Sequence, residues 1–189
     1  AARAIYAAIH LEVLGAERLS AVEVAASLDA HRGTPLALVS DEQIRADLEE
    51  FALIRSFSTE IVPPGTLIVR LVERAPIGAV VRGDAVDVID AAGVVVETAS
   101  APPAGLPLID VAPVAADDAA FSGVAEVLRT LPPELRATVT SISATTRDDV
   151  RFALGGAEHT VVWGSAERSP LKARVLAAAL ATTDQSVRW

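Results

Sequence analysis

Hydrophobic and polar positions alternate along two adjacent segments of the chain, residues 54–62 and 66–73. In the second segment Arg70 lies opposite an apolar side formed by Leu67, Val69 and Leu71. A period of two is typical of β-strands that bury one face. The intervening Pro63-Pro64-Gly65 fits a tight turn, because Pro presets φ and Gly accepts a positive φ. The two segments are therefore predicted to pair as a hairpin.

Two helix starts precede this hairpin. Ser20-Ala-Val-Glu23 and Ser40-Asp-Glu-Gln43 both have the spacing of a capping box, in which a hydroxyl and an acidic or amide side chain satisfy backbone N–H groups. After the second, Ile44, Leu48 and Phe51 recur at helical spacing. Residues 5–14 are rich in β-branched and aliphatic residues and end at Gly15, which predicts a first strand. The first third of the chain therefore has the predicted order β-α-α-β-β.

The pattern changes after Pro76 and Gly78. Asp117-Asp118 opens one predicted helix and Ser169-Pro170 opens another that runs to about Ala181. Short strands with turn signals are expected around them, at residues 79–82, 86–89, 94–97, 108–111, 138–142, 150–154, 159–163 and 185–189. We therefore expect an α+β chain with two domains, residues 1–75 and 76–189. The second domain is expected to hold a mostly antiparallel sheet with two packing helices.

Composition and charge exclude several classes of partner. Hydrophobic residues make up 51% of the 189 residues and aromatic residues only 4%, so the core is expected to consist of small aliphatic side chains. The net charge of −9 would repel a phosphate backbone, which argues against a nucleic-acid partner, and it disfavours anionic lipid for the same reason.

The sequence contains few residues in patterns that could support catalysis or metal binding. Cysteine is absent, and His10, His31 and His159 lie far apart, without the spacing of metal ligands. The acidic pairs Asp117/Asp118 and Asp148/Asp149 are better explained as a helix cap and a turn than as catalytic carboxylates. Ser165 lacks the G-x-S-x-G context of a hydrolase nucleophile. We therefore expect no catalytic residue, cofactor, metal or small-molecule substrate.

Several segments resemble the FtsQ/DivIB family of bacterial cell-division proteins. The most specific is Val72-Glu73-Arg74-Ala75-Pro76, which is similar to the family's V-E-R-x-P junction between a POTRA domain and a β domain. The resemblance also rests on residues 15–24, 33–44, 53–56 and 64–69, on Asp90-Ala-Ala-Gly93-Val94 and on Leu106-Pro107-Leu108. It implies that residues 1–75 are a POTRA domain and that residues 76–189 are a β domain of this type.

The resemblance further implies a non-catalytic scaffold of the divisome, on the extracytoplasmic face of the cell membrane at the septum. Its implied partners are the small coiled-coil division proteins FtsB/DivIC and FtsL. The resemblance also implies a single-pass membrane anchor, which is expected upstream of residue 1 because the chain itself has no apolar run of the ~18 residues that span a bilayer.

Exposed strand edges are the feature that could bind such a partner, because a second chain can add a strand there. We expect the last strand to provide this edge, with Ser186, Val187, Arg188 and Trp189 as the partner-binding residues. Trp163, at the end of a hairpin strand, is instead predicted to lie in the core.

The chain departs from the family pattern at two places. Ile61-Val62-Pro63-Pro64 replaces the family's Arg-x-Trp-Pro, and the last strand is shorter than usual. Two other functions stay open at this point. One is a POTRA-bearing chaperone of secretory or outer-membrane assembly, and the other is an extracytoplasmic hydrolase.

Overall fold

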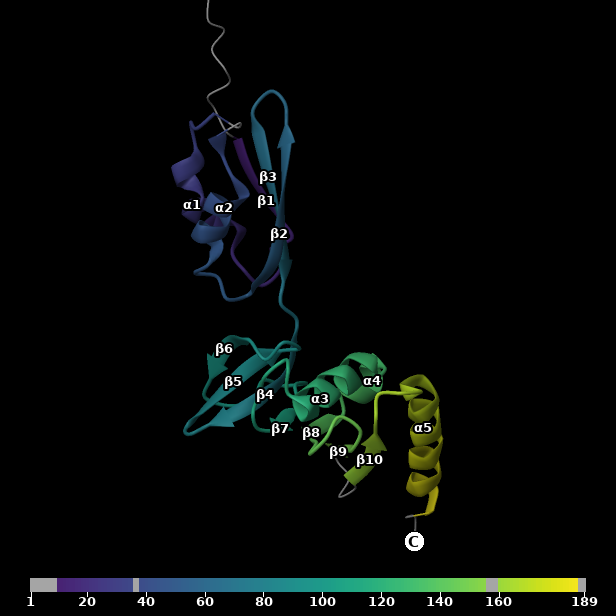
Figure 1. The fold of residues 1–189 in the computed structure, drawn as a ribbon. Coiled ribbons are helices and arrows are strands. Elements are labelled where there is room, and N and C mark those ends of the chain that lie inside the picture. Colours follow the sequence, from purple (N-terminus) through teal and green to yellow (C-terminus); the bar gives the residue numbers. More distant parts are fainter. Residues whose placement is uncertain (1–9, 36–37, 156–159, 187–189) are drawn as a thin grey trace, which may run out of the picture. The chain divides into compact units, whose positions relative to one another are not determined.

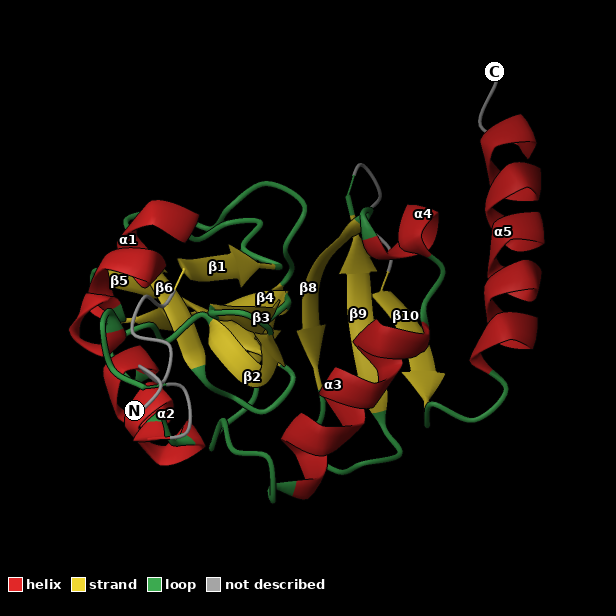
Figure 2. Ribbon diagram, turned by 90° about the horizontal axis from the view of Figure 1, so that it is seen from above, coloured by secondary structure: helices red, strands yellow, loops and turns green. Residues whose placement is uncertain are grey.

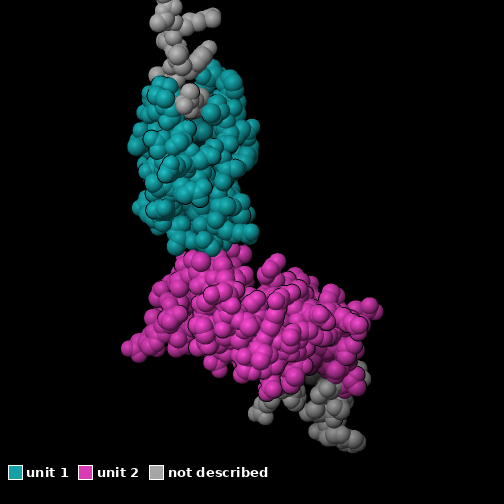
Figure 3. All heavy atoms as spheres, viewed as in Figure 1, with its two compact units in different colours: residues 1–74 teal, residues 75–189 magenta. Residues whose placement is uncertain are grey.

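The structure is a computed structural model that describes residues 10–35, 38–155 and 160–186. The chain divides between Arg74 and Ala75 into two compact units, residues 1–74 (unit 1) and residues 75–189 (unit 2), which are coloured separately in Figure 3. Each unit has its own sheet, helices and hydrophobic core. The α+β fold class predicted from the sequence is confirmed.

The described part of unit 1 forms a three-stranded sheet in the order β1-β3-β2 (Figure 1). Strand β1 (His10–Leu14) runs parallel to β3 (Thr66–Glu73), while β2 (Ile54–Val62) pairs with β3 in antiparallel register through the predicted hairpin. The central strand therefore donates and accepts backbone hydrogen bonds on both sides. Its alternate residues Leu67, Val69 and Leu71 are buried, as the period of two predicts.

Two helices cover the buried face of this sheet. Helix α1 (Ala21–Ser27) begins after Ser20, whose side chain accepts from the Glu23 amide at 3.3 Å. Helix α2 (Asp41–Leu48) has the full capping box, because the Ser40 hydroxyl accepts from the Gln43 amide and the Gln43 side chain accepts from the Ser40 amide. The core between helices and sheet consists of Leu11, Val24, Leu28, Ile44, Leu48, Leu67, Val69 and Leu71.

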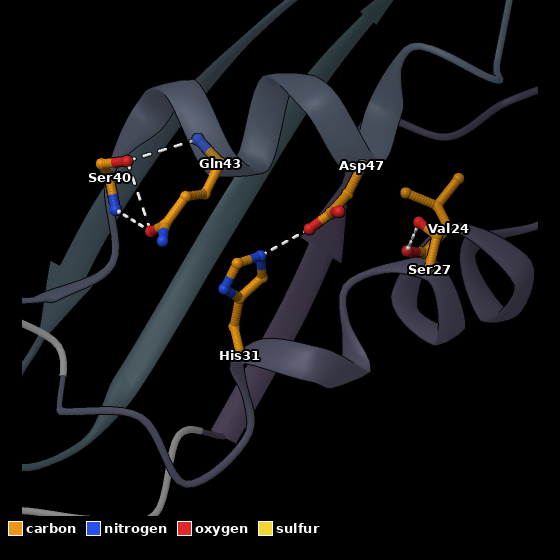
Figure 4. A network of polar contacts seen from close by, with 6 residues as sticks. All are labelled: Val24, Ser27, His31, Ser40, Gln43 and Asp47. Atoms are coloured by element: carbon orange, nitrogen blue, oxygen red, sulfur yellow. Dashed lines mark hydrogen bonds and ion pairs between the residues drawn. The ribbon is translucent and has the colours of Figure 1, made fainter.

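A short helix η1 (Asp29–His31), which the sequence patterns did not indicate, follows α1. It places the imidazole of His31 against α2, where Nε2 lies 2.6 Å from Oδ2 of Asp47 (Figure 4). The exposed fraction of His31 is only 8%, so this contact satisfies a polar ring inside the packed unit. His31 is therefore a structural residue that joins the two helices.

Unit 2 is built on a seven-stranded sheet in the order β10-β9-β8-β7-β4-β5-β6. Two pairs in its middle, β4–β7 and β7–β8, are parallel, and the four remaining pairs are antiparallel. The strands are β4 (Pro76–Arg82), β5 (Ala85–Asp90), β6 (Val95–Ala99), β7 (Leu108–Asp110), β8 (Val139–Ser143), β9 (Val150–Leu154) and β10 (Thr160–Gly164).

Helix α3 (Ala119–Thr130) packs against this sheet and contacts β4, β8 and β9. Its side chains Phe121, Val124, Val127 and Leu128 are fully buried. Asp118 begins the helix by accepting from the Phe121 amide at 2.8 Å, which is the predicted capping role. A further short helix, α4 (Pro133–Arg136), follows directly.

The last helix differs from the sequence-based expectation. Helix α5 (Ser169–Ser186) begins at the predicted residue but continues past Ala181. No Gly or Pro occurs in residues 181–186, so this segment lacks a strong signal that ends a helix. The predicted strand over residues 185–189 is therefore wrong at Gln185 and Ser186, which are helical, while Val187, Arg188 and Trp189 lie outside the described residues.

Candidate partner-binding edge

Strand β10 lies at one edge of the seven-stranded sheet. It pairs in antiparallel register with β9, and among the described residues no strand pairs with its other side. Backbone N–H and C=O groups along an edge of this kind can receive a strand from another chain. The sheet therefore presents a backbone edge at residues 160–164.

The two faces of β10 have different surroundings. Val161 pairs with Phe152 and lies on the face that α3 covers, as does Trp163, whose ring centroid is 5.4 Å from that of Phe152. Trp163 is 5% exposed, which confirms the predicted core position. Val162 points to the opposite face and is 71% exposed. An aliphatic side chain is thus left in solvent at the sheet edge.

Beside this edge, β10 and α5 enclose an apolar groove of about 520 Å³. Figure 2 shows α5 standing next to β10 rather than across the middle of the sheet. The exposed fractions of Leu171 and Val175 on α5 are 53% and 63%, so two aliphatic side chains there are also uncovered. The full lining is Val161, Val162, Trp163, Arg168, Leu171, Lys172, Val175, Leu176 and Ala179.

Polar contacts join the start of α5 to the end of β10. The indole Nε1 of Trp163 donates to Oγ of Ser169 at 3.2 Å, and Ser169 is completely buried. The ammonium group of Lys172 donates to the carbonyls of Trp163 and Ser165 at 3.1 and 2.9 Å, and it lies 5.8 Å from the Trp163 ring centroid. Hydrogen bonds of Ser169 and Lys172 therefore fix the position of the first turn of α5 relative to Trp163.

Charge distinguishes β10 from the other strands at sheet edges. Charged side chains on edge strands discourage the addition of a second chain. Strands β1 and β2 at the edges of unit 1 contain Glu12, Arg55 and Glu60, and β6 at the far edge of unit 2 contains Glu97. β10 contains no charged residue. Of the edges in the described ranges, β10 is therefore the one that lacks charged side chains of its own, and Lys172 of α5 binds the carbonyl of Trp163 near its end.

The histidines and acidic residues considered as metal ligands in the sequence do not come together in the described residues. His10 begins β1, His31 is paired with Asp47, and His159 lies outside the described residues. In the parts of the chain that the structure describes, no three His, Cys, Asp or Glu side chains come together as metal ligands.

Asp149 lies in the turn between β8 and β9, as the sequence predicts. Its carboxylate accepts from the Thr145 hydroxyl and from the amides of Thr146 and Thr145, both at 2.8 Å. These hydrogen bonds lower the pKa of Asp149 from 3.8 to about 2. A carboxylate held in its ionised form by a turn is poorly suited to proton transfer near neutral pH.

The partner-binding residues predicted from the sequence are only partly placed. Ser186 is the last residue of α5, and Val187, Arg188 and Trp189 lie outside the described residues. The edge at β10 was missed, because a further strand was expected to follow the helix. The absence of charge in residues 160–164 was the available sequence signal.

Comparison with known proteins agrees with the architecture. A family model described as "POTRA domain, FtsQ-type" matches residues 8–74. Among curated proteins, the cell division protein FtsQ of Mycobacteroides abscessus is 30% identical over 89% of this chain and 54% of its own length. FtsQ of Mycolicibacterium smegmatis is 32% identical over 93% of this chain and 52% of its own length. FtsQ of Streptomyces griseus is 28% identical over 87% of this chain and 82% of its own length.

The chain spans about half the length of the mycobacterial relatives it matches. The major extracytoplasmic domain of DivIB from Geobacillus stearothermophilus superposes on 62% of this chain with a TM-score of 0.41 and 17% identity. Among the described helices, none has the length and hydropathy needed to cross a bilayer. The FtsQ-type POTRA match over residues 8–74 and the six similar FtsQ proteins support the resemblance of this chain to the FtsQ/DivIB family of bacterial cell-division proteins.

Proposed function

We propose that this chain is a non-catalytic scaffold of the divisome that binds small coiled-coil division proteins of the FtsB/DivIC and FtsL type. In this proposal unit 2 is the β domain. A membrane anchor upstream of residue 1 holds both units on the extracytoplasmic face at the septum. The similarity to FtsQ proteins supports the division role. The open edge of β10 is the observation that supports protein binding.

The proposed contact is an extended segment of the partner that adds to β10. A strand added to an edge lies about 4.8 Å from its neighbour and supplies backbone hydrogen bonds. Alternate side chains of the added strand would contact the exposed aliphatic residues that line the groove, Val162, Leu171 and Val175. The partner segment is therefore expected to carry aliphatic residues at every second position.

The test is binding of the purified chain to the FtsB/DivIC-type protein encoded in the same genome. Replacing Val175 by Glu places a charge in the groove, and we expect affinity to fall about tenfold or more, as at other apolar contact centres. Val175 is exposed, so the variant is expected to fold. Val22→Glu, at an 80% exposed position of α1, is the matched control. Equal affinities for the two variants would refute the groove as the docking site.

Ser186, Val187, Arg188 and Trp189 remain proposed contributors, because they continue the chain from the helix that forms one side of the groove. Val187→Pro tests them separately, since Pro removes a backbone donor. Reduced capture of the partner would support their role. Unchanged capture would remove these four residues from the interface without affecting the assignment of β10.

A further inference from the structure

Three segments of unit 1 meet at the end where β3 begins. Strand β1 starts there, and the His10 amide donates to the Gly65 carbonyl at 2.9 Å. The β2–β3 turn at residues 63–65 lies at the same end (Figure 1). The Thr59 hydroxyl donates to the Asp41 carboxylate at 2.7 Å, and Thr59 pairs with Val69, so the start of α2 lies beside the half of the hairpin that is nearer this end.

The surface of this end is apolar. Ile61 and Val62 at the end of β2 are 53% and 37% exposed, and Leu38 is 67% exposed. Pro63 and Pro64 in the turn are exposed as well. No charged residue occurs in residues 61–68 or in residues 33–40. We call the exposed set Leu38, Ile61, Val62, Pro63 and Pro64 the apolar tip.

We propose that the apolar tip rests on the lipid surface into which the chain is anchored. This inference depends on the membrane anchor of the proposed function, because that anchor would precede β1 and β1 begins at this end of unit 1. Aliphatic side chains at the tip of a fold can enter the headgroup and acyl boundary of a bilayer, as the apolar faces of interfacial helices do, to a depth of about 5–10 Å. The tip would thereby orient unit 1 on its membrane.

The charged residues around the apolar tip determine which lipid headgroups it could contact. Asp41 and Glu42 are exposed at the start of α2, and Glu60 on β2 is paired with Arg70 at 3.0 Å. These carboxylates oppose contact with anionic headgroups. The surface that fits is therefore zwitterionic, such as phosphatidylethanolamine or phosphatidylcholine, and the contact depends on apolar burial rather than on charge.

The contact is too small to act without a tether. Even a myristoyl chain gives only marginal, reversible membrane binding, so five partly exposed side chains are not expected to hold the protein on a bilayer by themselves. An N-terminal anchor raises the effective concentration of the tip at the bilayer. We therefore test the chain with an N-terminal hexahistidine tag bound to nickel-chelating lipid in phosphatidylcholine and phosphatidylethanolamine vesicles.

The chain contains no cysteine, so a single introduced cysteine can carry an environment-sensitive fluorophore. Val62→Cys places the label on the tip, and Val72→Cys places it at a 49% exposed position about 20 Å further along the sheet, from the rise per strand residue. A doxyl quencher in the acyl region should reduce emission at position 62 about twofold or more, with little change at position 72. Leu38→Cys should respond like position 62 and serves if Val62→Cys fails to fold.

Equal quenching at positions 62 and 72 would overturn the proposal. So would a label at position 62 that is shielded without vesicles, because that result would indicate a contact between copies of the chain. Quenching should also persist at high salt, and its loss would indicate contact through charge. The tag supplies the tether, so these outcomes do not depend on the natural anchor or on partner binding at β10.

Discussion

The carboxylate of Glu73 accepts a hydrogen bond of 3.0 Å from the backbone N–H of Leu19, which lies at the start of the polypeptide segment that leads into α1. The amides of Glu17 and Arg18 donate to the same carboxylate at 2.8 and 3.0 Å. Three consecutive N–H groups therefore converge on one side chain at the end of β3. Glu73 belongs to the V-E-R-x-P segment, so this segment closes unit 1 as well as joining it to residues 75–189.

Replacing Glu73 with Ala is expected to destabilise unit 1 by about 1–2 kcal/mol, because hydrogen bonds to a charged group contribute more than neutral ones and these are partly solvated. The amides of residues 17–19 should exchange faster with solvent, which hydrogen exchange followed by NMR would detect. Glu60→Ala breaks an exposed ion pair with Arg70 and is the control, with an expected loss below about 0.5 kcal/mol. Equal effects of the two changes would contradict the role given to Glu73.

The same contact makes the stability of unit 1 sensitive to acid. Burial opposes ionisation of Glu73, but the amides of Leu19, Glu17 and Arg18 more than offset it, so its pKa is lowered from the ordinary value of 4.5. A lowered pKa in the folded state stabilises the fold above about pH 4.5, and this contribution is lost as the pH falls through the folded-state pKa. Thermal melting of the parent and of Glu73→Gln should therefore differ above pH 4.5 and converge at lower pH.

Gly15→Ala should be among the most damaging small substitutions in unit 1. Gly15 has φ +81°, and an added Cβ would lie 2.3 Å from the carbonyl oxygen of Leu71. Gly33 has a similar φ of +82°, but no atom lies within 4 Å of its Cβ position. We expect Gly33→Ala to cost about 1 kcal/mol from backbone conformation alone and Gly15→Ala to cost more than about 2 kcal/mol. Denaturant unfolding of both variants measures the difference, which would vanish if the two sites were equivalent.

Ser169→Ala should loosen the attachment of α5 to the sheet. The Ser169 hydroxyl accepts from Trp163 Nε1 and from the Thr130 hydroxyl, and it donates to the Ala166 carbonyl at 2.8 Å. Removing this fully buried hydroxyl leaves the Trp163 indole N–H without this acceptor, at an expected cost of about 1–3 kcal/mol, while Thr130 and the Ala166 carbonyl keep backbone partners. Thermal unfolding monitored by near-ultraviolet circular dichroism reports on the packing of Trp163. Thr182→Ala, which removes an exposed hydroxyl bonded within α5, should leave the melting temperature nearly unchanged.

The local elements were largely predictable from sequence. The alternation in residues 66–73 predicts which side chains of β3 are buried, and the Ser40 and Gln43 spacing predicts the start of α2. Both signals depend on neighbours within a few residues, whose geometry the backbone sets. The end of α5 was not predictable in the same way, because residues 181–186 lack a stop signal and favour no single conformation strongly.

The sequence by itself determined the order of the strands from β1 to β10 and the polar residues Ser20, Ser40 and Asp118 that begin α1, α2 and α3. Only the tertiary structure decided which strand lies at the open edge of the sheet and that Glu73 closes on the amides of residues 17–19. Pairing between strands and contacts between distant residues depend on the packing of the whole unit, and no short-range pattern encodes them. For that reason the edge that we propose for binding is β10 and not a strand at the end of the chain.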